Sequence, residues 1–233
     1  MKKRIVVYMG DERIYRQMMT AAKSLLLHNE VDRVYFLTDS DFPYELPDVI
    51  ECVNVHSQQI FSRSGPNIHR HYGYMTLMRA ALTKVFQQED RVLLLDPDTI
   101  VVDDISPLWD MCLDGYYFAA VQETRNNTHE EKPYWNAGVM LQNLDKLRRD
   151  GMDDKIIEMI NTAHYHHLEQ DILNLLCRGR IITLPSEYNA SFVSDPTDHP
   201  RIHHFLSTAK GGLIEYERKY GMMPWEEVMK GET

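Results

Sequence analysis

The sequence has little cysteine and lacks any long hydrophobic run. Its cysteines, Cys52, Cys112 and Cys177, are odd in number and too far apart for a disulfide framework or a metal-binding pair. Each has apolar sequence neighbours, so we expect all of them to be packing residues. No apolar stretch approaches the roughly 20 residues that a membrane-spanning helix needs. Residues 1–4 lead into a strand-like run rather than the core of a signal peptide, so we expect a cytoplasmic protein.

Positive charge is also in short supply. The 25 Lys and Arg residues are outnumbered by 35 Asp and Glu residues, which leaves a formal net charge of −10. This charge repels nucleic acid, and no local basic cluster in the sequence offsets it, so we expect no nucleic-acid partner. A phosphorylated small molecule meets the same repulsion. A phosphate-binding site in this chain would therefore need a cation from solution.

The hydrophobic pattern predicts an α/β fold. Strand and helix patterns alternate over the first hundred residues, which favours a mostly parallel sheet with crossover helices. The strand candidates there are 4–9, 34–39, 49–55 and 91–96, and the helix candidates are 14–28 and 72–88. The second half adds strand candidates at 118–123, 136–144, 180–185 and 201–205, and helices at 153–165 and 168–179. No repeat and no Gly- or Ser-rich linker divides the chain, so we expect one domain over 1–210.

Residues 211–233 form a C-terminal tail that is too apolar to be left in water. Its apolar and aromatic residues include Tyr216, Tyr220, Met222, Met223 and Trp225. We expect this tail to pack on the body of the protein or on a partner, and contact with a membrane surface stays open. The sequence does not indicate an oligomeric state.

Asp96 and Asp98 directly follow the most hydrophobic strand candidate. Residues 92–95 are a continuous aliphatic run, typical of a strand that is covered on both faces, and ligands of α/β sheets bind at the carboxyl ends of such strands. At about 3.3 Å per residue, the two Cα atoms lie roughly 6–7 Å apart with side chains pointing the same way. Both carboxylates can then reach one Mg²⁺ or Mn²⁺ ion. Turn residues at the end of a strand remain the alternative for an isolated Asp-x-Asp.

Several segments, in this order, make the chain resemble the family eight glycosyltransferases. They are RIVVYMGDERIY, MRAALTKVFQQEDRVLLLDPDTIVVDDISPLW, WNAGVMLQNL, EQDILN, LPSEYN and HFLSTAK. The resemblance covers nearly everything up to Lys210. It implies the GT-A fold, a single-domain nucleotide-diphosphosugar transferase architecture with a mostly parallel central sheet flanked by helices. It also implies a retaining hexosyltransferase that moves glucose or galactose from a UDP-sugar to a glycan, lipid or protein acceptor.

The resemblance implies a metal site. Asp96 and Asp98 match the aspartate pair that holds Mn²⁺ on the donor diphosphate, and His204 matches the third ligand. An imidazole beside two carboxylates shifts the preference from Mg²⁺ towards Mn²⁺. A core or surface histidine is the alternative for His204. Lys210 matches a lysine that contacts the diphosphate, and a solvated loop charge is the alternative for it.

The chain departs from the family pattern beyond His204. Ser207 stands where the family has a glycine, and Gly211 and Gly212 replace a Pro-Trp pair. We expect the loop over the diphosphate to close differently.

The resemblance also assigns contacts to the donor. Asp11 and Tyr15 match residues that bind the uracil by a hydrogen bond and by stacking, although the family commonly has one residue fewer between them. A core tyrosine is the alternative for Tyr15. Arg79 matches an arginine near the donor, with a helix-surface charge as its alternative. Asn136, Ala137 and Gly138 match a segment that faces the donor sugar, where a strand start after a turn is the alternative.

Glu169 to Asp171 match a polar trio at the first turn of a helix beside the anomeric carbon of the donor sugar, and Gln170 and Asp171 are the catalytic candidates among them. Acidic residues are also favoured at any helix start. An amide oxygen is a poor nucleophile, so retention favours a same-face route through an ion pair. Gln170 then stabilises the sugar cation, and the departing phosphate oxygen takes the proton of the acceptor.

Other functions stay open on the sequence. The LLLDPDTIVV segment resembles the start of haloacid-dehalogenase phosphohydrolases, but Ile100 stands where their motif has Thr and the motif is not at the first strand. A non-catalytic homologue that binds a nucleotide or glycan is the other alternative, because the chain departs from the family at Ser207 and between Asp11 and Tyr15.

Overall fold

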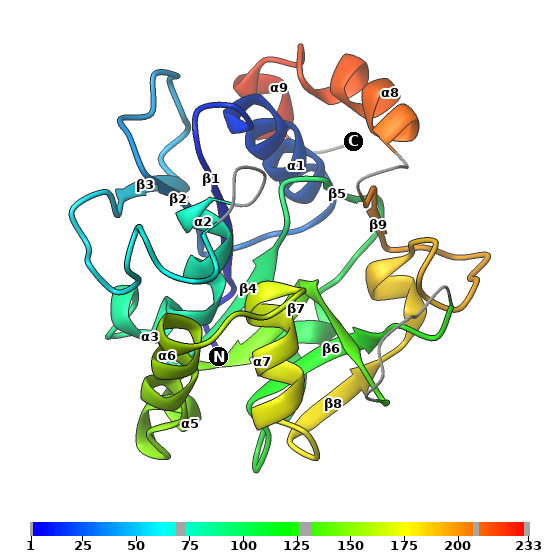
Figure 1. The fold of residues 1–233 in the computed structure, drawn as a ribbon. Coiled ribbons are helices and arrows are strands. Elements are labelled where there is room, and N and C mark those ends of the chain that lie inside the picture. Colours follow the sequence, from blue (N-terminus) through cyan, green and yellow to red (C-terminus); the bar gives the residue numbers. More distant parts are fainter. Residues whose placement is uncertain (1, 69–72, 126–131, 207–209, 231–233) are drawn as a thin grey trace.

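A computed structural model of the chain describes residues 2–68, 73–125, 132–206 and 210–230. Its centre is a seven-stranded sheet with the order β3-β2-β1-β4-β7-β6-β8 (Figure 1). The strands are β1 (Ile5–Gly10), β2 (Arg33–Thr38), β3 (Ile50–Asn54), β4 (Arg91–Leu95), β6 (Phe118–Gln122), β7 (Trp135–Asn143) and β8 (Ile181–Leu184). Only β7, among these strands, runs antiparallel to its neighbours, β4 and β6. The prediction of a mostly parallel α/β sheet is confirmed.

Helices cover both faces of the sheet. The longer ones are α1 (Tyr15–His28), α6 (Met152–Thr162), α7 (Leu168–Leu176) and α8 (Lys210–Tyr220). The shorter ones are α2 (Tyr74–Leu77), α3 (Leu82–Val85), α4 (Pro107–Asp110), α5 (Leu144–Arg149) and α9 (Trp225–Val228), with 3₁₀ turns η1 (Met78–Ala80) and η2 (Ser186–Asn189). One core cluster joins the sheet to α2, α3, α5, α6 and α7, and another joins it to α1 and α4. β4 lies between these clusters, and Val92 to Leu95 are fully buried, as their aliphatic run predicts.

The single helix predicted over 72–88 is wrong. Within its described part, the chain forms α2, η1 and α3 as separate short pieces. Ala81 leaves helical geometry, with φ −118° and ψ 16°, and so ends η1 before α3 begins. Met75, Met78 and Leu82 remain buried as expected. The apolar spacing identified the buried side of the segment but not the turn between its helices. One continuous helix and the observed series of short helices bury the same residues, so the spacing does not distinguish them.

The expectation for the cysteines is confirmed only for Cys177, which is buried in the core. Cys52 and Cys112 are exposed. Cys52 lies on β3, an edge strand of the sheet, and Cys112 follows α4 in a turn. Apolar sequence neighbours do not bury a residue when its own side chain points away from the core.

A small second sheet brings the end of the chain back to the centre. β5 (Thr99–Val101) pairs antiparallel with β9 (Ile202–His204), and Thr99 lies opposite His204. Beyond β9, α8 and α9 lie beside α1 (Figure 1). Lys23 of α1 donates hydrogen bonds from Nζ to the carbonyl oxygens of Gly221 (3.1 Å) and Met223 (2.6 Å). Within the described ranges, none of the helices combines the length and the apolarity that crossing a bilayer requires.

Candidate metal and donor site

Asp96, Asp98 and His204 converge at the carboxyl end of β4. Each offers one ligand atom, and these atoms all lie within 4.8 Å of one another. His204 Nε2 is 3.2 Å from Asp98 Oδ1 and 3.7 Å from Asp96 Oδ2. The Asp96 amide donates to the carbonyl of Gly138 on β7 (2.7 Å), and Thr99 donates from its amide to the carbonyl of Asp96 (3.0 Å). These backbone bonds turn the chain from β4 into β5, whose pairing with β9 delivers His204.

Asn189, at the end of η2, orients the imidazole of His204. His204 Nδ1 lies 2.9 Å from Asn189 Oδ1, and both side chains are buried. Asn189 in turn donates from Nδ2 to Asn136 Oδ1 (2.9 Å), which leaves its own oxygen as the acceptor for the Nδ1–H of His204. The lone pair on Nε2 then faces the two aspartates. A histidine that ligates a metal is usually held in this way through its other ring nitrogen.

Gly138 leaves the room that this cluster needs. A Cβ atom at this position would lie 2.2 Å from His204 Cε1 and 2.8 Å from Asp96 Oδ2. The glycine therefore serves close packing rather than an unusual backbone angle. This is the close approach that the Asn-Ala-Gly segment predicts.

The charges of the cluster are strongly coupled. Burial raises the pKa of Asp96, and the charge of Arg79 only partly offsets this effect. Burial also raises the pKa of Asp98, but the charge and hydrogen bond of His204 outweigh it, so the pKa lies below its usual value. Burial lowers the pKa of His204, but the charges of Asp98 and Asp96 and a hydrogen bond to Asp98 outweigh it and raise the pKa. The site thus favours a positive charge between the carboxylates.

The donor set fits a divalent cation. Three acceptor atoms at these separations repel one another unless a proton or a cation lies between them. The buried His204 Nε2 faces Asp98 Oδ1 and Asp96 Oδ2 across 3.2 and 3.7 Å, so three potential ligand atoms meet in one place. Two carboxylates and one imidazole suit Mn²⁺ and leave positions open for other oxygen ligands.

Arg79 joins the cluster to a second buried acid, Glu169, at the start of α7. Arg79 Nη2 lies 3.0 Å from Asp96 Oδ1, and Arg79 Nε lies 3.0 Å from Glu169 Oε1. Burial raises the pKa of Glu169 to about 7 although Arg79 opposes the shift. Arg79 lies within η1 and its side chain is 13% exposed, so the alternative of a helix-surface charge is wrong.

The sugar-facing segment predicted from the sequence lies beside this cluster. Gln170 Oε1 accepts a hydrogen bond from the Ala137 amide (2.8 Å), and Asn136 Nδ2 donates to Glu123 Oε1 (2.8 Å). Gln170 Nε2 also donates to Glu123 Oε1 at 3.3 Å. A buried polar network therefore runs from Gln170 through Glu123 and Asn136 towards the imidazole of His204.

Both carboxylate oxygens of Asp171 are engaged by neighbouring groups. Its Oδ1 accepts from the Tyr134 hydroxyl (2.6 Å), and its Oδ2 accepts from the His167 amide (2.8 Å). Gln170 Nε2 donates to the same Tyr134 hydroxyl (3.2 Å). The Tyr134 hydroxyl thus links the side chains of Asp171 and Gln170 by hydrogen bonds.

A cavity of about 360 Å³ opens beside the cluster. Its lining includes Gly10, Asp11, Arg13, Arg79, Asp96 and Asp98. Asp11 Oδ1 accepts from the Arg13 amide (3.0 Å) and from Arg13 Nε (2.9 Å), and this hydrogen bonding, although burial opposes it, lowers the pKa of Asp11. The structure therefore places Asp11, Arg79 and the paired aspartates around one space.

Tyr15 does not line this cavity, and the expectation that its ring stacks on uracil is wrong. The side chain is 2% exposed, its hydroxyl lies 2.8 Å from Ser40 Oγ, and its ring packs 4.7 Å from the Phe42 ring. The alternative of a core tyrosine is the one that the structure supports. The helical spacing of α1 turns Tyr15 inwards together with Met18, so no ring face is left for a ligand.

Ser207 and the side chain of Lys210 lie outside the described residues. Lys210 is the first residue of α8.

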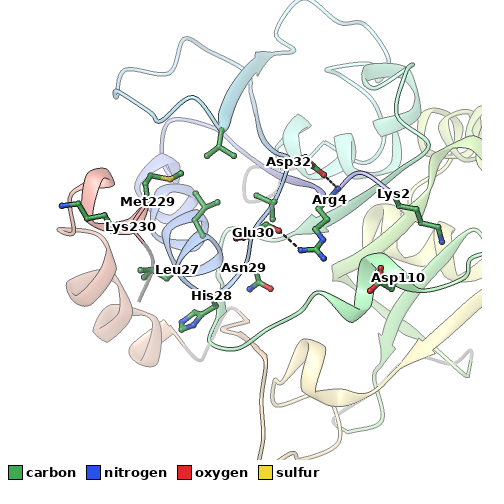
Figure 2. A pocket seen from close by; sticks show the side chains of 13 residues that line it. Lys2, Arg4, Leu27, His28, Asn29, Glu30, Asp32, Asp110, Met229 and Lys230 are labelled. Atoms are coloured by element: carbon green, nitrogen blue, oxygen red, sulfur yellow. Dashed lines mark hydrogen bonds between the residues drawn. The ribbon is translucent and has the colours of Figure 1, made fainter. Parts of the chain in front are cut away.

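A larger cavity, of about 920 Å³, lies at the opposite ends of the strands (Figure 2). It is lined by residues such as Lys2, Arg4, Asn29 and Met229 and includes none of the predicted site residues. Two polar groups of Arg4 there already have partners: its amide donates to Asp32, and its Nη1 donates to the carbonyl of Glu30. Chemistry rather than size therefore identifies the cavity beside Asp96 as the candidate site.

Sequence reasoning assigned no role to Glu123 or Asn189, and it placed Glu169 only as the first member of the polar EQD trio. Glu169 stands in the EQD segment and Asn189 in LPSEYN, so both were within reach of the family resemblance. Glu123 has no signal of its own in the sequence, because an acid at the end of a strand is usually exposed.

A sequence model described as glycosyl transferase family 8 matches residues 5–211. The chain belongs to glycosyl transferase family 8. Glycosyltransferase GlyE of Streptococcus pneumoniae serotype 4 (strain ATCC BAA-334 / TIGR4) is 30% identical over 97% of this chain and 63% of GlyE. Glycosyltransferase GlyA of the same organism is 28% identical over 90% of this chain and 32% of GlyA. The chain therefore spans less than two thirds of these relatives.

Solved structures of other glycosyltransferases have the same fold. The crystal structure of GlyE has a TM-score of 0.74 at 25% identity, covering 99% of this chain and 63% of GlyE. The structure of the galactosyltransferase LgtC with donor and acceptor sugar analogs has a TM-score of 0.71 at 23% identity, covering 95% and 98% of the two chains. The predicted GT-A fold is confirmed. Membership of family 8 excludes the phosphohydrolase alternative. The aspartates of the phosphohydrolase motif follow the first strand of the fold, whereas Asp96 follows β4.

Proposed function

We propose that this family 8 glycosyltransferase moves a hexose, glucose or galactose, from a UDP-sugar to a glycan, lipid or protein acceptor with retention of configuration. The observation that carries the proposal is the convergence of Asp96, Asp98 and His204 at the edge of a cavity that also contains Asp11 and Arg79. A nucleoside diphosphate needs positive charge in a chain of this acidity. The cluster is where a cation would supply it.

The residues that would hold Mn²⁺ are Asp96, Asp98 and His204, with Mg²⁺ as the alternative ion. When bound, the ion acts as a Lewis acid that stabilises the leaving diphosphate, an effect worth several kcal/mol. Asn189 keeps His204 Nε2 directed at the aspartates, and Gly138 leaves room for that arrangement. Lys210, at the start of α8, is the proposed second contact to the diphosphate, and Asp11 the proposed partner of the uracil.

The donor sugar would lie against Asn136, Ala137 and Gly138, with Gln170 beside its anomeric carbon. Gln170 is held by the Ala137 amide and by Glu123, so its amide dipole is oriented before a substrate arrives. We assign it the stabilisation of positive charge on the sugar. The departing phosphate oxygen takes the proton of the acceptor, and Asp171 contributes by holding Tyr134.

The test is donor turnover by the purified chain. UDP-glucose and UDP-galactose are incubated with Mn²⁺, with Mg²⁺ and with a chelator, and release of UDP is measured. We expect UDP release with Mn²⁺ from at least one of these donors, and its loss on chelation. Turnover that is unchanged by the chelator would remove the metal from the proposal, and absence of any UDP release with both donors would contradict the proposed activity.

A further inference from the structure

Phe205 occupies a position that touches two of the proposed metal ligands through the backbone. It directly follows His204 in sequence, and its amide donates a 2.9 Å hydrogen bond to the carbonyl oxygen of Asp98. A displacement of Phe205 therefore moves His204 through a covalent bond and Asp98 through a hydrogen bond. The Phe205 ring lies on the side of His203 and Tyr216, whose rings it contacts.

The ring of Phe205 is held from that side by α8. A Cβ atom at Gly212 would lie 2.6 Å from Phe205 Cε1 and 3.2 Å from its Cδ1, so the helix backbone touches the ring at this point. The ring also packs 5.7 Å from the ring of Tyr216 and 5.9 Å from the ring of His203. A Cβ atom at the neighbouring Gly211, in contrast, would have no heavy atom within 4 Å.

The helix α8 is itself anchored on the body of the protein. Leu213 and Tyr220 are each 2% exposed and form a small core with the fully buried Ile100 of β5. At its end, Lys23 of α1 holds the carbonyl oxygens of Gly221 and Met223, and the Lys23 ammonium lies 4.9 Å from the centre of the Trp225 ring. The position of α8 against β5 and β9 is thus set by several independent contacts.

We propose that Phe205 is a positioning residue for the Asp98–His204 pair, and that α8, packed on its ring at Gly212, sets the affinity of this pair for a divalent cation. This inference rests on the proposed function, because it takes Asp98 and His204 as metal ligands. The proposed contact accounts for one of the glycines that depart from the family pattern. At residue 212 any side chain would collide with the Phe205 ring, so α8 can pack on this ring only with glycine there. Residue 211 has open space around it and does not need to be glycine.

The experiment compares alanine at these neighbouring glycines. Both Gly212→Ala and Gly211→Ala gain the same intrinsic helix preference, so a difference between them reports the contact with Phe205. The dissociation constant for Mn²⁺ is measured from the electron paramagnetic resonance signal of free Mn²⁺, without any sugar substrate, and the melting temperature of each variant is recorded. We expect Gly212→Ala to bind Mn²⁺ about tenfold or more weakly, and Gly211→Ala to stay within about twofold of the unmodified chain.

A second substitution separates positioning from general loss of stability. Phe205→Leu removes the ring atom nearest to residue 212, so the double variant Gly212→Ala/Phe205→Leu should bind Mn²⁺ more tightly than Gly212→Ala alone. A folded Gly212→Ala with unchanged Mn²⁺ affinity would overturn the inference. If that variant does not fold, Phe205→Ala, which adds no bulk, takes its place, and unchanged affinity there has the same meaning.

The outcomes also distinguish this inference from the proposed function. If the unmodified chain binds Mn²⁺ and Asp98→Asn does not, the metal site stands, and equal affinities of the glycine variants overturn only the role of α8. If the unmodified chain and Asp98→Asn bind Mn²⁺ equally, the proposed ligands are wrong and the inference fails with them.

Discussion

Asn189 and His204 form a hydrogen bond of 2.9 Å between Asn189 Oδ1 and His204 Nδ1, and both side chains are buried. The bond decides which nitrogen of the imidazole faces the aspartates. It also connects the candidate metal ligands to Asn136 and, through it, to the segment that we assign to the donor sugar. The candidate site is therefore one buried polar network rather than a set of separate contacts.

Replacing Asn189 by Leu should weaken Mn²⁺ binding about 10- to 100-fold, because the imidazole loses the acceptor that orients it. The unfolding free energy should also fall by about 1–3 kcal/mol, since buried donors and acceptors lose their partner. Asn67→Leu is the matched control: Asn67 is equally buried and donates to the carbonyls of Ile160 and Ala163, away from the cluster. It should destabilise the fold yet bind Mn²⁺ normally. Similar Mn²⁺ affinities for the two variants would contradict this role of Asn189.

Asp98→Asn should abolish Mn²⁺-dependent UDP release while the protein stays folded. The change removes a charged ligand but keeps the shape of the side chain, and 23% of this side chain is exposed, so the core is little disturbed. Circular dichroism and denaturant unfolding check the fold, and Mn²⁺ titration checks the site. Asp198→Asn, at an exposed position, should behave like the unmodified chain. An Asp98→Asn variant with full turnover would remove Asp98 from the mechanism.

Gly138→Ala should destroy the site although the substitution adds only one methyl group. That group would lie 2.2 Å from His204 Cε1, so the imidazole or the strand must move. Overpacking of this kind costs about 1–3 kcal/mol of unfolding free energy. Mn²⁺ titration measures the loss of metal affinity, and urea unfolding measures the loss of stability. Gly211→Ala is the control for the general effect of replacing a glycine by alanine. Tight Mn²⁺ binding by Gly138→Ala would show that the ligands do not need this close packing.

Glu169 should make the metal-free protein more stable at acidic pH than at alkaline pH. Its pKa in the folded protein is raised to about 7 from 4.5, so its contribution to stability is fully present below pH 4.5 and is lost as the pH rises through about 7. The full effect is at most about 3 kcal/mol. Urea unfolding at pH 5.5, 7 and 8.5 with a chelator measures the slope, and Glu169→Gln should flatten it. Equal slopes for the two proteins would mean that Glu169 is ionised throughout this range.

The local pattern of the sequence was sufficient for the strands of the central sheet and for the site residues that lie within one segment, but it did not predict β5 (Thr99–Val101). The aliphatic run at 92–95 predicts a buried central strand, and the structure has β4 there between two core clusters. Asp96 and Asp98 are close together because they are neighbours in sequence on an extended chain. Hydrophobic period does not encode strand direction, however, so the antiparallel insertion of β7 was not predicted.

The rest was decided by contacts between distant segments. The pairing of β5 with β9 brings His204 to the aspartates, the packing of η1 beside α7 places Arg79 near Asp96, and the packing of α1 takes Tyr15 into the core. Family resemblance pointed to His204 and Arg79, but nothing local could show which histidine of the neighbouring pair faces inwards. The sequence determined which side chains were apolar and which carried charge; the tertiary structure alone decided which of them meet, because burial of a shared core selects among the pairings that local patterns permit.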